Sequence, residues 1–228
     1  MKRAAAVASA AVLTLAVASP ATADYIGGTD GADKLRGTPG PDVIQGHGGD
    51  DTIRAGGGHD DIKGGDGDDH IHVGNDEWNS AEGDAGDDVI YAGLGFSLHL
   101  GGLGDDTMMG GYSFDHLRGN EGNDRLRGGQ SGDAFEPDQG ADIVRGGPGR
   151  DFVYLYLDET EPSEGNGPIM GAEDRIFCGH GEDSVWLGGF AMDPADHIHE
   201  SCEEGNVRTG VSRQEFVHKA NRGLRGGE

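Results

Sequence analysis

The chain has 228 residues, 45 of them Gly, and a formal net charge of −25. A surface this acidic excludes nucleic acid and anionic lipid as partners and attracts cations. Because only 34% of the residues are hydrophobic and 6% aromatic, an ordinary globular core is excluded, and the apolar residues must line a thin, repetitive interior of the kind found in solenoids.

Residues 1–23 are predicted to be a secretory signal peptide. Lys2 and Arg3 form its charged start, Ala4 to Ala18 its apolar stretch, and Ala21-Thr22-Ala23 a small-x-small cleavage site. An N-terminal membrane anchor is the alternative, which the short apolar stretch disfavours. No second long apolar run follows, so we expect an exported, extracellular protein without a transmembrane segment, and an association with the cell surface stays open.

From Gly28 to Tyr154 the chain repeats a nine-residue unit, Gly-Gly-x-Gly-x-Asp-x-apolar-x, which is a repeat signature of calcium-binding parallel β-helices. Fourteen copies follow one another, with one extra residue in the sixth, and Gly101–Met109 is the clearest copy. Twelve copies carry Asp at the sixth position: Asp33, Asp42, Asp51, Asp60, Asp69, Asp88, Asp106, Asp115, Asp124, Asp133, Asp142 and Asp151. The eighth position is apolar in the same twelve copies; the sixth and eighth copies carry Asn79 with Ala81 and Ser97 with His99 instead.

The repeat divides the chain into segments. Residues 24–154 are the repeats, residues 155–170 an insertion expected to form a surface loop, and residues 171–202 degenerate final repeats in which Asp174 with Ile176 and Asp183 with Val185 resume the pattern. Residues 203–228 are expected to be a frayed tail, and the alternative is a cap over the last coil with a short helix within Val211 to Ala220.

An acidic, Gly-rich chain of this kind is also typical of disorder, but a disordered tract has no reason to place an aliphatic residue every nine positions. We therefore predict an all-β parallel β-roll, a β-solenoid in which the first six residues of each unit form a turn and the last three a strand. The eighth residue points inward, and the seventh and ninth point outward. Two units make one coil, so copies two apart lie directly above one another.

Calcium takes six to eight oxygen ligands, and stacked Gly-rich turns supply carbonyl oxygens while one Asp per turn supplies charge. Stacked carboxylates repel one another without the ion and clamp neighbouring coils with it. We therefore expect several Ca²⁺ ions to be part of the fold, so that binding supplies folding free energy.

These residues resemble the haemolysin-type (RTX) calcium-binding repeats, which form a parallel β-roll. The resemblance is close over residues 28–154 and loose over 171–186, and it implies that the twelve sixth-position Asp residues, together with Asp174 and Asp183, are the calcium ligands. Many members are toxins or proteases exported through a C-terminal signal, whereas the N-terminal leader makes this chain similar to small secreted calcium-binding proteins of actinobacteria. In these, a segment like Ile176–Asp183 is followed by an Asp-rich stretch and a second Cys, here Asp193–Cys202.

The chain has two cysteines, Cys178 and Cys202. In an exported protein they are expected to form a disulfide, which would stabilise the fold by roughly 3 kcal/mol in the chain-entropy model. Two independent buried thiols are the alternative.

Other chemistry finds little support in the sequence. The pairs His70 with His72 and His197 with His199 have the spacing of a weak zinc or copper site, but a solvated strand face explains them better. No His-Glu-x-x-His, Gly-x-Ser-x-Gly or phosphate-binding Gly-x-x-x-x-Gly-Lys motif is present, so we expect no enzyme. The alternative function is an extracellular adhesin or matrix module that presents a face of the roll to an unknown protein or glycan.

The two edges of the roll are expected to differ. The odd copies give an unbroken row from Asp33 to Asp142 with six neighbouring pairs, each able to share an ion. On the other edge Asn79 and Ser97 interrupt the row and leave three pairs, 42/60, 115/133 and 133/151. The roll should be weakest at the sixth to eighth copies, where Ala81 and His99 also alter the core.

Overall fold

The computed structural model describes residues 23–76, 78–156, 173–188, 197–202 and 207–209. Residues 1–22 of the predicted signal peptide, residues 157–170 of the predicted insertion, and the tail apart from 207–209 lie outside the described residues. The described segments consist of strands and turns, and no helix in them is long and apolar enough to cross a membrane.

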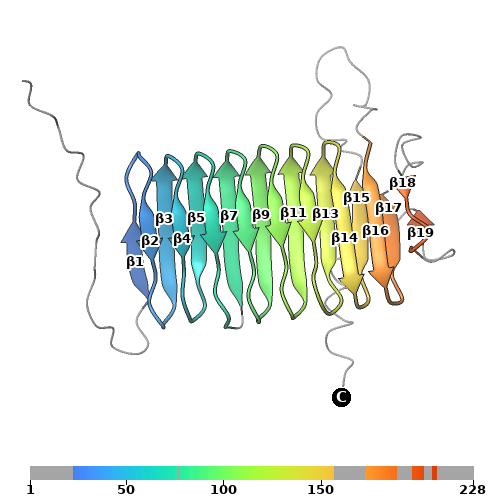
Figure 1. Ribbon diagram of the computed structural model, residues 1–228, viewed down its shortest axis with the longest axis horizontal. Coiled ribbons are helices and arrows are strands. Elements are labelled where there is room, and N and C mark those ends of the chain that lie inside the picture. The colour runs from blue at the N-terminus through green and yellow to red at the C-terminus, as the bar shows by residue number, and fades with distance from the viewer. Residues whose placement is uncertain (1–22, 77, 157–172, 189–196, 203–206, 210–228) are drawn as a thin grey trace, which may run out of the picture.

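The strands stack along one axis in two parallel sheets (Figure 1). The ten-stranded sheet contains β1 (Asp24–Gly27), β3 (Asp42–Gly48), β5 (Asp61–Asp66), β7 (Asn79–Ala85), β9 (Ser97–Leu103), β11 (Asp115–Glu121), β13 (Ala134–Gln139), β15 (Phe152–Tyr156), β17 (Ser184–Gly188) and β19 (Val207–Thr209). The nine-stranded sheet contains β2 (Lys34–Arg36), β4 (Thr52–Arg54), β6 (His70–His72), β8 (Val89–Tyr91), β10 (Thr107–Met109), β12 (Arg125–Arg127), β14 (Ile143–Pro148), β16 (Arg175–His180) and β18 (His197–Ile198). Each strand pairs with the strands two before and two after it, which confirms the predicted parallel β-roll.

The core lies between the two sheets and consists of the eighth-position side chains. From Ile44 to Val185 these side chains are at most 1% exposed, Ala81 and His99 included. Leu35, in the first full coil, is only partly buried. The period-two alternation of a strand places one residue of each three inside, so a chain poor in apolar residues still builds a continuous core.

Three features differ from the sequence-based expectation. Many strands of the ten-stranded sheet are longer than three residues, because pairing resumes in the following turn, as at His47 and Gly65. An additional coil begins at β1, where Asp24 pairs in register with Asp42. The ninth position is not always exposed, since Glu136 and Tyr154 are buried on the outer face of β13 and β15.

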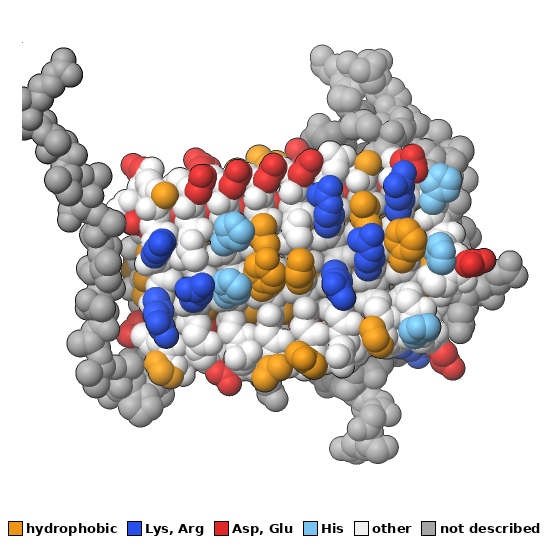
Figure 2. Space-filling view, in the orientation of Figure 1, with side chains coloured by type: hydrophobic (Ala, Val, Ile, Leu, Met, Phe, Trp, Pro, Cys, Tyr) orange, Lys and Arg blue, Asp and Glu red, His pale blue; other side chains and the backbone are white. Residues whose placement is uncertain are grey.

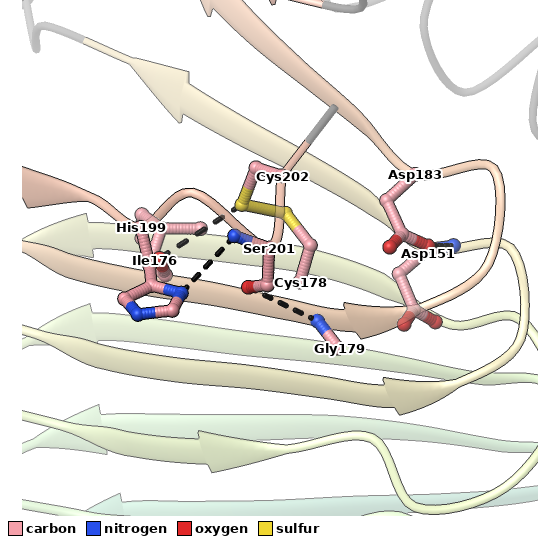
Figure 3. The surroundings of a disulfide bond; sticks show 8 residues. All are labelled: Asp151, Ile176, Cys178, Gly179, Asp183, His199, Ser201 and Cys202. Carbon is pink, nitrogen blue, oxygen red and sulfur yellow. Dashed lines mark hydrogen bonds between the residues drawn. A yellow bond between two sulfur atoms is a disulfide. The ribbon is translucent and has the colours of Figure 1, made fainter. Parts of the chain in front are cut away.

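The two cysteines form a disulfide at the C-terminal end of the roll (Figure 3). Cys178 lies in β16 with its side chain in the core, and Cys202 follows β18, 5.0 Å away between Cα atoms. The backbone N–H of Cys202 donates to the carbonyl of His199, and the N–H of His199 donates to the carbonyl of Ile176, which ties the last turn to β16. The predicted pairing is therefore confirmed, and it fastens the end of the solenoid, where coils have a neighbour on only one side.

Candidate metal centre

The sixth-position residues lie at or near the beginning of the strands and form two rows, one along each edge of the roll. The continuous edge, before the strands of the nine-stranded sheet, carries Asp33, Asp51, Asp69, Asp88, Asp106, Asp124, Asp142 and Asp174. The interrupted edge, at the strands of the ten-stranded sheet, carries Asp42, Asp60, Asn79, Ser97, Asp115, Asp133, Asp151 and Asp183. All fourteen predicted acidic residues therefore lie in the two rows, and most are fully buried.

Hydrogen bonds link the carboxylates of the continuous edge from coil to coil. The backbone N–H of Asp88 donates to Oδ1 of Asp106, for example, and the N–H of Asp106 donates to Oδ1 of Asp124, both at 2.8 Å. Seven such bonds of 2.7 to 2.9 Å run without a break from Asp33 to Asp174. The last bond spans the insertion, so the row continues into the final repeats beyond the pairs counted from the sequence.

The second carboxylate oxygen, Oδ2, differs from Oδ1 in its hydrogen bonding. In nine residues Oδ2 is buried and has no hydrogen-bond partner among the described residues: Asp51, Asp60, Asp69, Asp88, Asp106, Asp124, Asp133, Asp142 and Asp151. Burying an anionic oxygen without a partner is costly, and native proteins rarely do it. The nine residues are the later members of the nine pairs predicted from the sequence, six on the continuous edge and three on the interrupted edge.

In seven of these residues, all except Asp60 and Asp142, Oδ2 lies near a backbone carbonyl oxygen of the next coil, on either side of a glycine. A Cβ built on Gly101 would lie closer than 3.0 Å to both Oδ2 of Asp106 and the carbonyl oxygen of Gly119. The same crowding recurs at Gly83, with Oδ2 of Asp88 and the carbonyl of Gly101. At these glycines a side chain would crowd the two oxygens, and a carboxylate and a carbonyl converge at each of them.

This donor set fits calcium. Within the described part of the chain no three His, Cys, Asp or Glu side chains gather at one point, so a site must draw on backbone carbonyls. Calcium accepts a mixture of carboxylate and carbonyl oxygens, whereas zinc prefers nitrogen and sulfur ligands.

The carboxylates are perturbed by their burial. Burial raises the pKa of Asp88 to about 8 and of Asp142 to about 8, although the backbone N–H bond to each carboxylate opposes the shift. On the interrupted edge burial raises the pKa of Asp133 to about 9 and of Asp60 to about 7. A positive charge beside Oδ2 would remove this penalty, because an adjacent cation favours the ionised form.

Comparison with known families gives the same answer as the geometry. The family model described as RTX calcium-binding nonapeptide repeat matches residues 27–62, 48–77, 73–95, 100–134 and 138–156. The chain belongs to this RTX family. No match was found among the curated proteins. RTX repeats bind calcium, so the two rows of buried carboxylates are its candidate ligands.

The RTX pattern fails in the middle of the interrupted edge. The N–H of Asp60 donates to Oδ1 of Asn79 at 2.9 Å, but the N–H of Asn79 donates to the carbonyl of Phe96 and not to Ser97. The N–H and hydroxyl of Ser97 both donate to Oδ1 of Asp115, at 2.9 and 2.6 Å. The bonded row is therefore broken between Asn79 and Ser97.

An aromatic row occupies this part of the edge. The rings of Trp78 and Phe96 lie 4.5 Å apart, and those of Phe96 and Phe114 are stacked 5.6 Å apart. Leu94 and Tyr112, in the same turns, are more than half exposed. This row was not predicted from the sequence, although the eighteen-residue spacing of Trp78, Phe96 and Phe114 is visible once copies two apart are compared.

At the N-terminal end protein donors reach the carboxylates of the first RTX turns. Oδ2 of Asp33 accepts the N–H and hydroxyl of Thr29, and Oδ2 of Asp42 accepts the N–H of Thr38. Asp24 takes a sixth-position place before Asp42 that sequence analysis did not assign; an Asp-x-apolar triplet eighteen residues upstream was the available signal.

A second, exposed acidic row runs beside the continuous edge at the fifth position. Its N–H groups and carboxylates are linked coil to coil through Asp50, Asp68, Asp87, Asp105 and Asn123.

Proposed function

We propose that this protein is an exported, non-enzymatic calcium-binding protein whose roll folds when calcium occupies its edges. The observation that supports this most directly is the set of nine buried Oδ2 atoms without a hydrogen-bond partner among the described residues. The chain belongs to the RTX family, and seven of these atoms, all except those of Asp60 and Asp142, converge with a backbone carbonyl of the next coil.

The residues of each site have separable roles. The Oδ1 atom holds the carboxylate in place by accepting the N–H of the preceding coil, as Asp106 does for Asp88. The Oδ2 atom and the carbonyl of the next coil then provide oxygen ligands. When bound, Ca²⁺ supplies positive charge that offsets the stacked carboxylates and joins two coils at once. Pairs 142/174 and 151/183 extend the two rows into the last coils.

Calcium titration of the mature chain, followed by circular dichroism, tests the proposal. We expect the chain to be largely disordered in EGTA and to gain full β-structure at millimolar calcium. Magnesium should be a poor substitute because it demands a tighter octahedral site and keeps its waters. A chelated sample that retains full β-structure would overturn the dependence on calcium.

Export is tested on the protein as it is made by cells that process secretory leaders. Mass spectrometry of the medium should find a chain that begins at Asp24, after cleavage behind Ala23. Retention of residues 1–23 in the released protein would contradict this part of the proposal. A screen of the purified protein for hydrolase activity should be negative.

A further inference from the structure

The positive charge of this acidic protein is concentrated on one face. Outward side chains of the nine-stranded sheet include seven exposed cations, Lys34, Arg36, Arg54, Arg125, Arg127, Arg145 and Arg175. They also include His70, His72 and His197, and no strand of this sheet contains Asp or Glu. Figure 2 shows Lys, Arg and His side chains gathered over one face of the roll, with a row of acidic side chains along one border.

The two sheets differ in whether their Lys and Arg side chains form ion pairs. On the ten-stranded sheet Lys63 pairs with Glu82, and Arg118 pairs with Asp138. On the nine-stranded sheet Arg175 pairs with Glu173, but among the described residues the other six cations form no ion pair. We call these seven cations and three histidines the basic face. Among the described residues, acidic side chains pair with this face only at its C-terminal end.

The like charges of the basic face destabilise the fold. Arg36 lies in register with Arg54, and Arg127 with Arg145, so like charges sit on neighbouring strands. Neighbouring strands are about 4.8 Å apart, and like charges placed directly opposite one another are destabilising. These cations point outward from the core. Arg125 is close enough to the continuous edge to favour the ionised forms of Asp105 and Asp124, and Arg145 lies over the ring of Phe177. A partner that carries negative charge would offset their repulsion.

We propose that the basic face binds a linear acidic polysaccharide, laid along the roll axis. The cations form two rows parallel to that axis, with a central neutral stretch at Val89, Tyr91, Thr107 and Met109. An extended chain with spaced carboxylates can contact both charged ends and cross the neutral centre. The inference rests on the proposed function in one respect, because the face exists only when the roll is folded.

Two features favour a single narrow chain over other polyanions. A flat anionic bilayer pressed against the face would also approach the acidic row of Asp50, Asp68, Asp87 and Asp105 at its border. Single-stranded nucleic acid is usually held by aromatic rings free for base stacking. Here the ring of Tyr91 stacks on His72 at 4.8 Å, and that of Phe177 lies beneath Arg145 at 5.5 Å, so both rings already contact neighbours.

Calcium has a second consequence for this surface. A chain with a net charge of −25 repels polyanions at long range unless its acidic edges are neutralised. Calcium at the edges would reduce that repulsion and leave the basic face as the main source of positive potential. Binding of the polysaccharide should therefore require calcium and weaken as salt is raised.

The test uses the mature, calcium-loaded chain and hyaluronan, a linear polysaccharide with regularly spaced carboxylates, at low ionic strength. Neutral dextran, single-stranded DNA and phosphatidylglycerol vesicles are the comparison ligands. The test variant is Arg36→Gln with Arg54→Gln, and the control is Lys63→Gln with Arg150→Gln, which removes the same charge away from the face. Losing two surface charge contacts should weaken hyaluronan binding by about tenfold in the test variant only.

Stability is a second readout. If Arg36 and Arg54 serve the fold, removing them lowers the Tm; here we expect an unchanged or higher Tm together with weaker binding. Equal weakening by the control variant, no hyaluronan binding by the folded chain, or tighter binding to DNA or vesicles would each overturn the inference. Circular dichroism on the same samples distinguishes a failure of the proposed function from a failure of this inference. If the β-structure does not depend on calcium, the proposed function is wrong, and hyaluronan binding is still measured on the folded chain.

Discussion

The two edges of the roll are built from the same nine-residue unit and differ at a few positions. On the continuous edge each sixth-position carboxylate after Asp33 accepts a backbone N–H from the preceding coil, and six Oδ2 atoms lack a hydrogen-bond partner among the described residues. On the interrupted edge Asn79 and Ser97 replace two carboxylates, and the rings of Trp78, Phe96 and Phe114 lie beside them. Strand pairing nevertheless continues through the gap, with Asn79 in register with Ser97.

The two edges show that the repeat makes two separate contributions, coil stacking and calcium dependence. The backbone ladder and the eighth-position core keep the coils stacked, and they do not need a carboxylate in every turn. The carboxylates add charge that must be neutralised, and they make stacking depend on the ion. An edge can therefore lose its acids locally and substitute aromatic contact, provided that the opposite edge is complete.

The largest effect should come from pH in the calcium-free chain. Burial raises the pKa of Asp69 to about 6, of Asp106 to about 7 and of Asp88 to about 8 on the continuous edge. A carboxyl whose folded pKa is raised contributes stability below its unfolded pKa, and this contribution is lost as pH rises through the folded value. The metal-free roll should therefore be more stable at pH 5 than at pH 7.5, because a protonated Oδ2 can donate to the facing carbonyl.

Circular dichroism in EGTA at the two pH values measures the difference in stability, and hydrogen exchange identifies the amides that gain protection. Amides bonded to Oδ1 along the continuous edge should gain more protection at pH 5 than the amide of Asn79, which bonds to a carbonyl. Equal disorder at both pH values would show that burial of the carboxylates is not what opposes folding without calcium.

The next effect concerns the close approach of the oxygens. Gly101→Ala would place a methyl group against Oδ2 of Asp106 and the carbonyl of Gly119, whereas Gly31→Ala meets nothing within 4 Å. Overpacking of this kind typically costs about 1–3 kcal/mol, and here it also fills the ligand position. We expect Gly101→Ala to raise the calcium midpoint of folding strongly and Gly31→Ala to leave it unchanged. Similar midpoints for the two variants would mean that the turn relaxes to admit the methyl group.

A single carboxylate on each edge gives the third comparison. Asp88→Ala removes a buried charge and leaves the N–H of Asp69 without its acceptor, a loss of about 1–3 kcal/mol before any calcium is counted. Asp42→Ala frees the partly buried N–H and hydroxyl of Thr38, so its cost should be smaller. Calcium-dependent melting of both variants measures the difference, and a larger loss for Asp42→Ala would reverse our ranking of the edges.

Much of this arrangement was predictable because the repeat constrains it. The inward eighth position, the stacking of copies two apart and the location of the carboxylates follow from a nine-residue period and a two-residue strand alternation. The Cys178–Cys202 pairing followed from their being the only cysteines. The nine pairs of neighbouring carboxylates were also countable from the sequence, and the structure adds that Oδ2 of the later member of each pair has no hydrogen-bond partner within the described part of the chain.

The remaining features depend on positions that the repeat leaves free. Fifth-position residues point away from the core, so the repeat does not constrain them, and the row of Trp78, Phe96 and Phe114 becomes visible only when copies two apart are compared. The outward Lys and Arg residues were expected to be exposed, but their segregation to one sheet emerges only when odd and even copies are assigned to opposite faces. The burial of Glu136 beside His116, at 3.2 Å, likewise depends on tertiary packing at an outward position.

The smallest effect should come from repairing the interrupted edge. Asn79→Asp with Ser97→Asp would complete the row from Asp60 to Asp115 and create three new neighbouring pairs of carboxylates. In calcium we expect up to three additional ions by isothermal titration calorimetry and a slightly higher Tm. In EGTA the variant should be no more stable than the natural chain, because the added carboxylates repel Asp60 and Asp115. The single variants serve as controls, since each creates fewer pairs.

The repair also tests why this part of the edge departs from the pattern. If charge alone is missing, the double variant gains ions, and the aromatic row is a neighbour without influence on the turn. If the ion count stays the same, the turn backbone is at fault, since the carbonyl of Phe96 already accepts the N–H of Asn79. Adding Trp78→Gly and Phe96→Gly to the double variant separates the two causes. Ions that appear only after the rings are removed would show that aromatic packing holds the turn in a shape that cannot bind calcium.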